Sequence, residues 1–277
     1  MDDSYLSLTF NVVPVSGIEI LIAELSLLDF ELFEEKSQGL VAYIKACDFN
    51  ENFLKKVNIL HSKDFEIKYE INKIQNKNWN EEWEKNYHPV EINESCTIRA
   101  PFHKASNKSY DIIIKPEMSF GTGHHETTQL MIDFLFEQNL ENKKICDVGC
   151  GTGVLSIIAE KRGAKKIDAV DFDVVCYDNT IDNIKRNDCK KINTKQSSSD
   201  GLIGNNYDII LSNITLNNLK SNFENFKKIS NQSTILIISG FYKNDLDRVN
   251  LMLKKFEFEL LDYKIKNNWV ASRYYCS

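Results

Sequence analysis

Residues 145–153 read Ile-Cys-Asp-Val-Gly-Cys-Gly-Thr-Gly, a short apolar strand that runs directly into a glycine-rich turn. A dinucleotide-binding turn places its glycines as G-x-G-x-x-G between a strand and a helix. Here the glycines stand at Gly149, Gly151 and Gly153, and Val154 takes the position of the last glycine of that pattern. The turn is therefore tight enough for its backbone to approach a ligand, but it matches a pyrophosphate-binding turn poorly.

The segments after this turn repeat a strand followed by a helix, which is typical of a parallel sheet with helices on both faces. The predicted pairs are 144–148 with 154–161, 166–170 with 176–186, 207–212 with 216–228, and 234–239 with 244–256. Two last apolar stretches, 258–266 and 269–276, predict an antiparallel hairpin that closes one edge of the sheet. Because such sheets bind ligands at the carboxyl ends of their strands, we expect the loops 149–153, 171–173 and 212–215 to meet there.

The first 74 residues predict a separate, small α+β domain. Predicted strands at 5–13, 32–35, 40–45 and 65–71 alternate with helical patterns at 17–28 and 51–60. The resulting order, βαββαβ, is that of a ferredoxin-like fold. This segment holds no catalytic set of residues, so we interpret it as a binding module that presents a substrate.

Charge is distributed unevenly along the chain. Residues 1–72 contain 13 acidic and 6 basic side chains, a net charge of -7, whereas the whole chain of 277 residues carries -6. An acidic region disfavours direct nucleic-acid binding, which depends mainly on Lys and Arg. It suits a basic protein partner, and an acidic surface that only aids solubility is the open alternative.

A polar connection follows the small domain. Residues 75–90 predict a linker helix, in which Trp79 and Trp83 lie four positions apart and so share one face. Residues 91–277 then form the larger domain, which adds short strands near 89–92, 96–100 and 111–114 before a helix that begins at Thr127.

Composition narrows the class of protein. The chain is 42% hydrophobic, and no apolar run approaches the roughly 20 residues that cross a bilayer. The seven cysteines are scattered without C-x-x-C spacing, and the first residues do not read as a signal peptide. We therefore expect a cytoplasmic protein with reduced thiols and no bound metal.

Two aspartates are candidate ligand-binding residues. Asp171 ends the second strand, 22 positions after Gly149, which is close to the roughly 20 expected for a carboxylate that binds ribose hydroxyls. A role as a helix cap is the alternative for Asp171. Asp147, two residues before the first glycine, is expected to order the turn and to face a cationic, amine-bearing part of the ligand.

The third strand ends at Asn213, which opens the sequence Asn-Ile-Thr-Leu. Methyltransferases that act on DNA bases or glutamine amides carry Asn-Pro-Pro and an aromatic residue at this place, so the missing prolines argue against those substrates. His124 and His125 are adjacent on a loop. We expect them to order that loop or to contact substrate, and a direct role in proton transfer is the less favoured alternative.

The glycine-rich turn after an acidic residue resembles the first motif of Rossmann-like methyltransferases, which bind S-adenosylmethionine. Residues 120–128, Phe-Gly-Thr-Gly-His-His-Glu-Thr-Thr, together with residues 147–155, Asp-Val-Gly-Cys-Gly-Thr-Gly-Val-Leu, make the resemblance specific. They are similar to the PrmA family, the methyltransferases of ribosomal protein L11. That family joins a ferredoxin-like recognition domain to a class I methyltransferase domain through a linker, so the resemblance covers nearly the whole chain.

The resemblance implies that Thr128, Gly149, Asp171 and Asn213 contact S-adenosylmethionine, and the turn adds Gly151 and Asp147 to the candidate site. Asn213 is also the candidate catalytic residue. The family usually continues after this asparagine with Ile-Leu, whereas Thr215 follows Ile214 here.

The reaction implied is methyl transfer to amines of ribosomal protein L11, at lysine side chains and at the N-terminus, by a monomer that needs neither a membrane nor nucleic acid. Two alternatives stay open from the sequence. One is a class I methyltransferase of another protein, an arginine or a small molecule. The other is a nucleotide-binding adaptor without catalytic activity.

Overall fold

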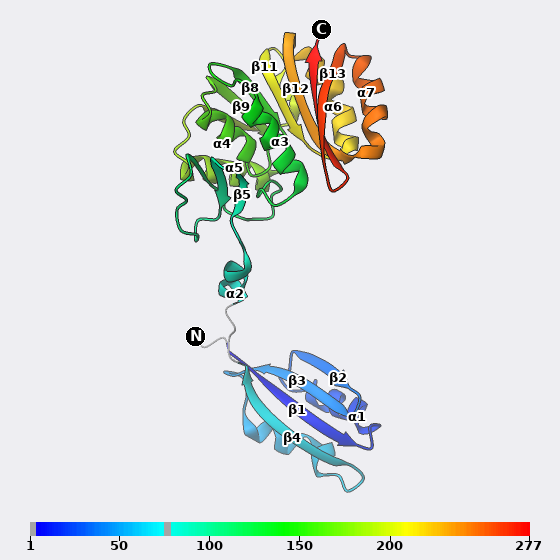
Figure 1. Ribbon diagram of the computed structural model, residues 1–277. Coiled ribbons are helices and arrows are strands. Elements are labelled where there is room, and N and C mark those ends of the chain that lie inside the picture. Colours follow the sequence, from blue (N-terminus) through cyan, green and yellow to red (C-terminus); the bar gives the residue numbers. More distant parts are fainter. Residues whose placement is uncertain (1–3, 75–78) are drawn as a thin grey trace. The chain divides into compact units, whose positions relative to one another are not determined.

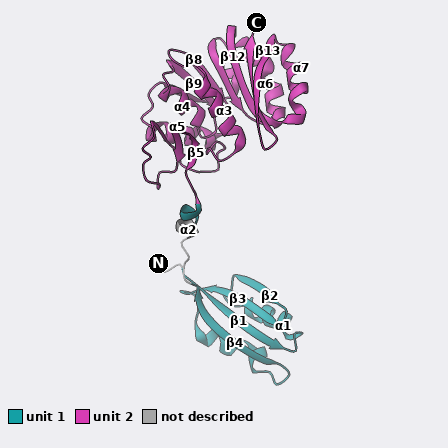
Figure 2. Ribbon diagram, in the orientation of Figure 1, with its two compact units in different colours: residues 1–86 teal, residues 87–277 magenta. Residues whose placement is uncertain are grey.

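The computed structural model describes residues 4–74 and 79–277 and divides the chain into two compact units, 1–86 and 87–277 (Figure 2). Each unit has its own hydrophobic core. None of the helices in the described ranges combines the length and the apolarity needed to cross a bilayer.

The first unit is a four-stranded antiparallel sheet with the order β2-β3-β1-β4 (Figure 1). Its elements are β1 (Tyr5–Val13), α1 (Gly17–Leu25), β2 (Leu32–Lys36), β3 (Gly39–Lys45) and β4 (Glu66–Ile74). One side of the sheet buries Leu8, Phe10 and Leu40 against Leu21 and Leu25 of α1. This order and connectivity confirm the predicted ferredoxin-like α+β unit.

The helix predicted over 51–60 is wrong. The segment forms two short 3₁₀ helices, Glu51–Lys56 and Asn58–His61, separated at Val57, whose backbone is extended (φ -84°, ψ 99°). The Asn50 side chain accepts a hydrogen bond from the backbone N–H of Asn52 and starts the first of them. Leu54, Val57 and Ile59 still reach the core, because apolar spacings of two and three residues suit a broken 3₁₀ segment as well as one α-helix.

The connection carries α2 (Trp79–Asn86). The Trp83 side chain is about half exposed, whereas the side chain of Trp79 and residues 75–78 lie outside the described part of the chain. The predicted anchoring of this helix by its two tryptophans stays a prediction.

The second unit contains a seven-stranded sheet in the order β10-β9-β8-β11-β12-β14-β13. Strands β8 to β12 are parallel, and β14 and β13 add an antiparallel hairpin at one edge. The strands are β8 (Lys144–Val148), β9 (Lys166–Asp171), β10 (Ile192–Gln196), β11 (Tyr207–Asn213), β12 (Ser230–Tyr242), β13 (Phe258–Lys266) and β14 (Trp269–Cys276). The doubly wound class I fold and its terminal hairpin are thereby confirmed.

Helices cover both faces of this sheet (Figure 1). On one side lie α3 (Glu126–Glu137), α4 (Val154–Lys161) and α5 (Val174–Arg186), and on the other lie α6 (Leu216–Lys228) and α7 (Leu246–Lys254). A small sheet of β5 (Val90–Asn93), β6 (Cys96–Arg99) and β7 (Tyr110–Ile113) joins the core on the α3–α4 side. The sequence prediction missed β10, an edge strand whose pattern Ile-Asn-Thr-Lys-Gln buries no residue completely.

Candidate functional site

The glycine-rich turn joins β8 to α4 and has no room for side chains. Gly149, Gly151 and Gly153 have φ of +75°, +57° and +77°, a region that other residues rarely adopt. A Cβ on Gly151 would lie 2.3 Å from the carbonyl oxygen of Phe120. Glycine is therefore required at position 151 both for its backbone angle and for the close approach of a second loop.

That second loop, residues 119–123, is fastened to the turn by Thr152. The Thr152 N–H donates to the Phe120 carbonyl (2.9 Å), and its hydroxyl donates to the Gly121 carbonyl (2.7 Å). Thr152 is fully buried. Because a buried hydrogen bond is costly to break without a replacement, the two loops form one rigid wall.

Two asparagines, one in α5 and one directly after its last residue, hold the backbone on either side of this wall. Asn183 accepts from the N–H of Lys115 (2.8 Å) and donates to the carbonyl of Thr152 (3.0 Å). Asn187 accepts from Ile113 N–H (2.9 Å) and donates to its carbonyl (2.6 Å). Both side chains are buried, so α5 replaces the missing strand partners of residues 113–115.

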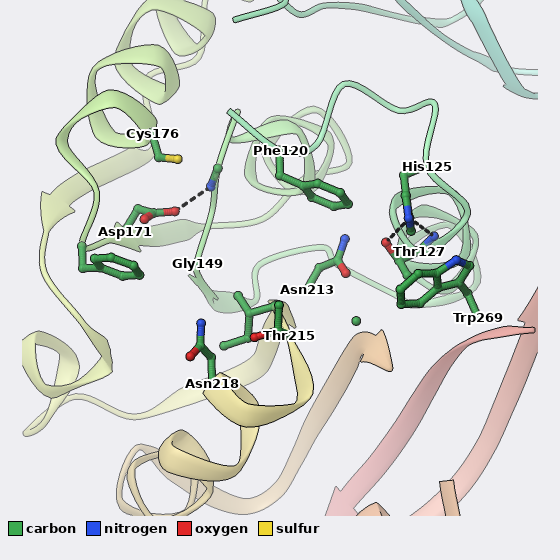
Figure 3. Close-up of a pocket in the computed structure, with 14 residues that line it drawn as sticks. Phe120, His125, Thr127, Gly149, Asp171, Cys176, Asn213, Thr215, Asn218 and Trp269 are labelled. Atoms are coloured by element: carbon green, nitrogen blue, oxygen red, sulfur yellow. Dashed lines mark hydrogen bonds between the residues drawn. The ribbon is translucent and has the colours of Figure 1, made fainter. Parts of the chain in front are cut away.

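A cavity of about 320 Å³ opens at the carboxyl ends of β8, β9 and β11, beside this wall (Figure 3). Its lining comes from loops that are far apart in the sequence. The residues are Phe120, His125, Thr127, Gly149, Gly151, Asp171, Phe172, Cys176, Asn213, Ile214, Thr215, Asn218, Gly240 and Trp269. Four of the six predicted cofactor residues, Gly149, Gly151, Asp171 and Asn213, therefore line one cavity.

Asp171 lies at one end of the cavity, beside Cys176 (Figure 3). One carboxylate oxygen accepts from the N–H of Gly151 (3.0 Å) and the other accepts from the N–H of Asp173 (3.1 Å). Each oxygen keeps a further lone pair for a ligand hydroxyl. The alternative role as a helix cap falls to Asp173, whose side chain accepts from Val175 N–H and caps α5.

Asn213 occupies the middle of the cavity (Figure 3). Its Nδ2 donates to the hydroxyl of Thr128 at 3.4 Å. Thr128 is buried and is absent from the cavity lining. The structure thus places Thr128 behind Asn213, where it orients the amide and leaves Oδ1 as the acceptor.

Asp147 is also absent from the cavity lining. It is almost completely buried beneath the turn, where its Oδ2 accepts from the Ser156 hydroxyl (2.7 Å) and its Oδ1 has no hydrogen-bond partner. Burial raises the pKa of this carboxyl to about 7. An unpartnered buried carboxylate oxygen fits a site that is completed by a cationic group.

The two histidines have different surroundings. His125 caps α3 by accepting from the N–H of Thr127, and its ring packs edge-on against Phe120 (5.1 Å) and Trp269 (4.8 Å). His124 bonds instead to Thr122 (3.2 Å) and to the carbonyl of His88 (3.0 Å). His124 therefore orders the loop, whereas His125 belongs to the cavity wall.

Sequence reasoning missed the aromatic part of the wall. Trp269 comes from the start of β14 and packs against Tyr242 at 4.1 Å between ring centres. No motif marks Trp269, because only the pairing of β14 with β12 brings it beside α3. In the sequence, only its location directly after the predicted hairpin turn could have indicated Trp269 as a cavity residue.

Comparison with known proteins identifies similar chains over nearly the full length. The sequence model of the family described as ribosomal protein L11 methyltransferase (PrmA) matches residues 15–274. A ribosomal protein L11 methyltransferase of Bacteroides thetaiotaomicron is 37% identical over 276 residues, with 98% of this chain and 99% of the relative covered. The corresponding protein of Porphyromonas gingivalis is 34% identical, with 94% and 91% covered.

The fold is found in a solved structure. The crystal structure of a ribosomal protein L11 methylase from Lactobacillus delbrueckii subsp. bulgaricus superposes with a TM-score of 0.64 at 22% identity. It covers 69% of this chain and 100% of that chain. The likeness supports the class I architecture of the larger unit.

The buried Asp147 predicts a dependence of stability on pH. The folded pKa of about 7 lies above the value of about 3.9 in an unfolded chain. Folding is therefore favoured by this group below about pH 4, and that contribution is lost as the pH rises toward about 7. The melting temperature of the ligand-free protein should fall between about pH 5 and pH 7 relative to that of Asp147→Asn, a neutral variant of similar shape.

Thermal unfolding of both proteins across this range checks the prediction. Asp208→Asn is the control, because Asp208 lies at the opposite ends of the strands, where it accepts from the N–H of Lys144. A constant difference between wild type and Asp147→Asn at every pH would contradict the assigned pKa.

Proposed function

The chain belongs to the ribosomal protein L11 methyltransferase (PrmA) family, and on this premise we propose that it transfers methyl groups from S-adenosylmethionine to amines of ribosomal protein L11. The proposed amines are lysine side chains and the N-terminal amine. The observation that carries the proposal is the meeting of Gly149, Gly151, Asp171 and Asn213 around one cavity.

The shape and polarity of the cavity support a sulfonium nucleoside over a dinucleotide. Val154 begins α4, with its side chain buried, where a dinucleotide fold would have glycine. Asp171 can accept from two ribose hydroxyls, and the exposed Phe172 ring beside it offers an apolar surface for a base. The glycine-rich turn lets backbone, rather than side chains, face the ligand.

S-adenosylmethionine, when bound, supplies a methyl group on an electrophilic sulfonium. What the protein must add is alignment of the nucleophile and exclusion of water. Thr128 orients the Asn213 amide, so that Oδ1 can accept a hydrogen bond from an incoming amine. This contact directs the nitrogen lone pair without requiring a general base on the enzyme.

The aromatic side of the cavity suits a lysine. Phe120, His125 and Trp269 line it in a continuous series of ring contacts, and Tyr242 packs against Trp269. A wall of this kind packs against the four-carbon stem of lysine and removes water from its amine. Desolvation lowers the pKa of an ammonium from its usual value of about 10.4, which favours the neutral nucleophile.

The acidic first unit is the proposed recognition module. Its residues 1–72 carry a net charge of -7, and ribosomal proteins are commonly basic because they bind RNA. Opposite charges accelerate encounter and favour the correct partner. Recognition and chemistry would then be located in different units of the chain.

Methyl transfer from isotopically labelled S-adenosylmethionine to purified ribosomal proteins tests the function. We expect label in ribosomal protein L11, on lysine and on the N-terminal amine, as located by mass spectrometry of its peptides. Arginine or small molecules as the sole acceptors would redirect the substrate assignment. Absence of any transfer, with retained nucleoside binding, would make the chain a binding adaptor.

Replacement of Asp171 should weaken cofactor binding. Loss of hydrogen bonds to a charged group typically costs about 1.5–3 kcal/mol, which is roughly a 10- to 150-fold increase in Kd. Calorimetry with S-adenosylhomocysteine measures this for Asp171→Ala and for Asp171→Asn, which keeps an acceptor for Gly151. Asp173→Ala is the control, and saturable binding of NAD in place of the sulfur nucleoside would refute the assignment.

Replacement of Asn213 should lower turnover. Misalignment of reacting groups costs on the order of 10²-fold, so Asn213→Ala should reduce kcat even at saturating cofactor. Thr128→Val, which removes the hydroxyl behind Asn213, should share part of this loss, and Thr128→Ser should restore activity. An altered cofactor affinity with normal kcat would instead restrict Asn213 to binding.

Removal of the first unit should separate binding from recognition. A chain that begins at Trp79 keeps the whole second unit together with its own hydrophobic clusters. It should bind S-adenosylhomocysteine with unchanged Kd and lose most methylation of ribosomal protein L11. Full activity of the shortened chain would show that the first unit is dispensable for recognition.

A further inference from the structure

A repeated sequence lies at the amino ends of the strands β8, β9 and β10, opposite the strand ends that form the cavity. Lys-Lys-Ile occurs three times, at 143–145, 165–167 and 190–192. Each isoleucine is the first or second residue of its strand, β8, β9 or β10. Ile145 and Ile167 belong to the hydrophobic core, and Ile192 packs against it. The two lysines before it therefore stand where each chain segment enters the sheet.

The sheet brings these three lysine pairs side by side. Lys144 pairs with Lys166 in the register of β8 and β9. The N–H of Lys165 donates to the carbonyl of Lys143 (2.9 Å), and that of Ile167 donates to the carbonyl of Lys191 (3.0 Å). Since neighbouring strands lie about 4.8 Å apart, six lysines are concentrated at the amino ends of three adjacent strands. We call Lys143, Lys144, Lys165, Lys166, Lys190 and Lys191 the lysine edge.

Most of these ammonium groups are available for a ligand. All except the half-buried Lys143 are exposed. Lys166 pairs with Asp168 (3.0 Å), and Lys191 donates to the carbonyl of Ala164 (3.2 Å). Among residues 4–74 and 79–277, no ion pair is formed by the other four.

The nearby carboxylates are largely engaged. Glu160 accepts from the backbone N–H groups of Lys190 and Lys191, and Asp208 accepts from that of Lys144 (2.7 Å). Asp168 accepts from Tyr207 and Asn193. Even with Glu141 and Asp188 of the adjoining turns counted, six lysines face five carboxylates, on a chain whose net charge is -6.

Two polar hollows lie at the same edge. The first, of about 530 Å³, is lined by Lys144, Lys165 and Lys166, by the carboxylates of Asp168 and Asp208, and by four asparagines, Asn142, Asn205, Asn206 and Asn231. The second, of about 310 Å³, shares Asp208 and Asn231 with it and adds Lys143, Gln138, Asn139 and Gln232. Amide groups both donate and accept hydrogen bonds, so this surface offers more than charge.

We propose that the lysine edge and its amide-lined hollows bind the phosphate backbone of RNA. Lysines contact phosphates as point charges, and amides reach phosphate and sugar oxygens. The polar lining distinguishes the surface from a membrane-binding face, which would present apolar side chains beside its lysines. The choice of RNA as the bound polyanion rests on the proposed ribosomal substrate. The clustering of the lysines is a feature of the structure and is independent of that proposal.

The contact is an accessory one. It lies at the amino ends of strands whose carboxyl ends form the cavity, so bound RNA leaves the cavity open. Methylation of a free protein substrate does not require it. The consequence we infer is a weak hold on RNA-associated substrate that fades as salt concentration rises.

The test is fluorescence anisotropy of a labelled single-stranded RNA of about 20 nucleotides with the full-length chain, from about 50 to 200 mM salt. No methyl donor is present, so the result is independent of the proposed methyl transfer. The lysine-edge variant carries Lys144→Gln, Lys165→Gln and Lys190→Gln. It removes three positive charges, none of which belongs to an ion pair among the described residues. Lys63→Gln, Lys104→Gln, Lys255→Gln, on exposed positions elsewhere, is the control with the same net charge.

The wild type and the control should bind alike. The lysine-edge variant should bind RNA at least about tenfold more weakly at low salt. Its slope of log affinity against log salt should be shallower by about 2, since each phosphate contact contributes about 0.7 for single strands and three lysines are replaced. Equal weakening of both variants, or no RNA binding by the wild type, overturns the proposal. So does lysine-dependent binding to anionic phospholipid vesicles without RNA binding. Equal melting temperatures of the three proteins confirm that the comparison concerns folded chains.

Discussion

The candidate site depends on the hydrogen bonds of one buried residue, Thr152. Its N–H and hydroxyl bind two successive carbonyls of the 119–123 loop, and its own carbonyl accepts from Asn183. A turn of three left-handed glycines has little conformational preference of its own. Thr152 supplies the missing restraint, because it ties the turn to a loop on one side and to α5 on the other.

Restraints of this kind explain how the loops around an open cavity keep fixed positions. A sheet positions the ends of its strands, but the loops beyond them need partners of their own. Here α5 provides those partners through buried asparagines, and Asp171 closes the turn through Gly151 N–H. The backbone N–H groups of Ile113, Lys115 and Gly151 are thus bonded within the protein, and the side chains of Asp171 and Asn213 are the proposed contacts to a ligand.

The proposed methyl transfer from a sulfonium asks for alignment more than for acid–base chemistry, and the roles proposed for the site residues follow from that requirement. Asn213, the proposed orienting group, is itself held by Thr128 from outside the cavity. Phe120, His125 and Trp269 form the proposed dry approach for the amine, and Asp147 is buried beneath the turn. The strand direction then separates functions: the carboxyl edge carries the proposed chemistry, and the amino edge carries the lysines.

Local patterns were sufficient for much of this protein. The glycine spacing at 149–153, the strand before it and Asp171 after the next strand predicted the fold and one end of the cavity, because each rests on short-range geometry that the chain repeats in every βα unit. The split βαβ order of the first 74 residues followed from alternating apolar spacings. The strands β13 and β14 were predicted with their observed bounds, since long alternating segments leave little choice.

Tertiary structure decided what local patterns leave open. Asp147 was expected to order the turn and to face the ligand; the structure buries it beneath the turn, where Ser156 in the first turn of α4 donates to its carboxylate. Apolar periodicity predicted one helix over 51–60, whereas the segment is interrupted at Val57. It missed the edge strand β10, because that strand has no buried face. Trp269, Phe120 and His125 meet only because β14 pairs with β12 and the 119–123 loop is tied to Thr152. Residues that interact across a hundred or more positions leave no spacing in the sequence, and it is the packing of the whole sheet that brings them into contact.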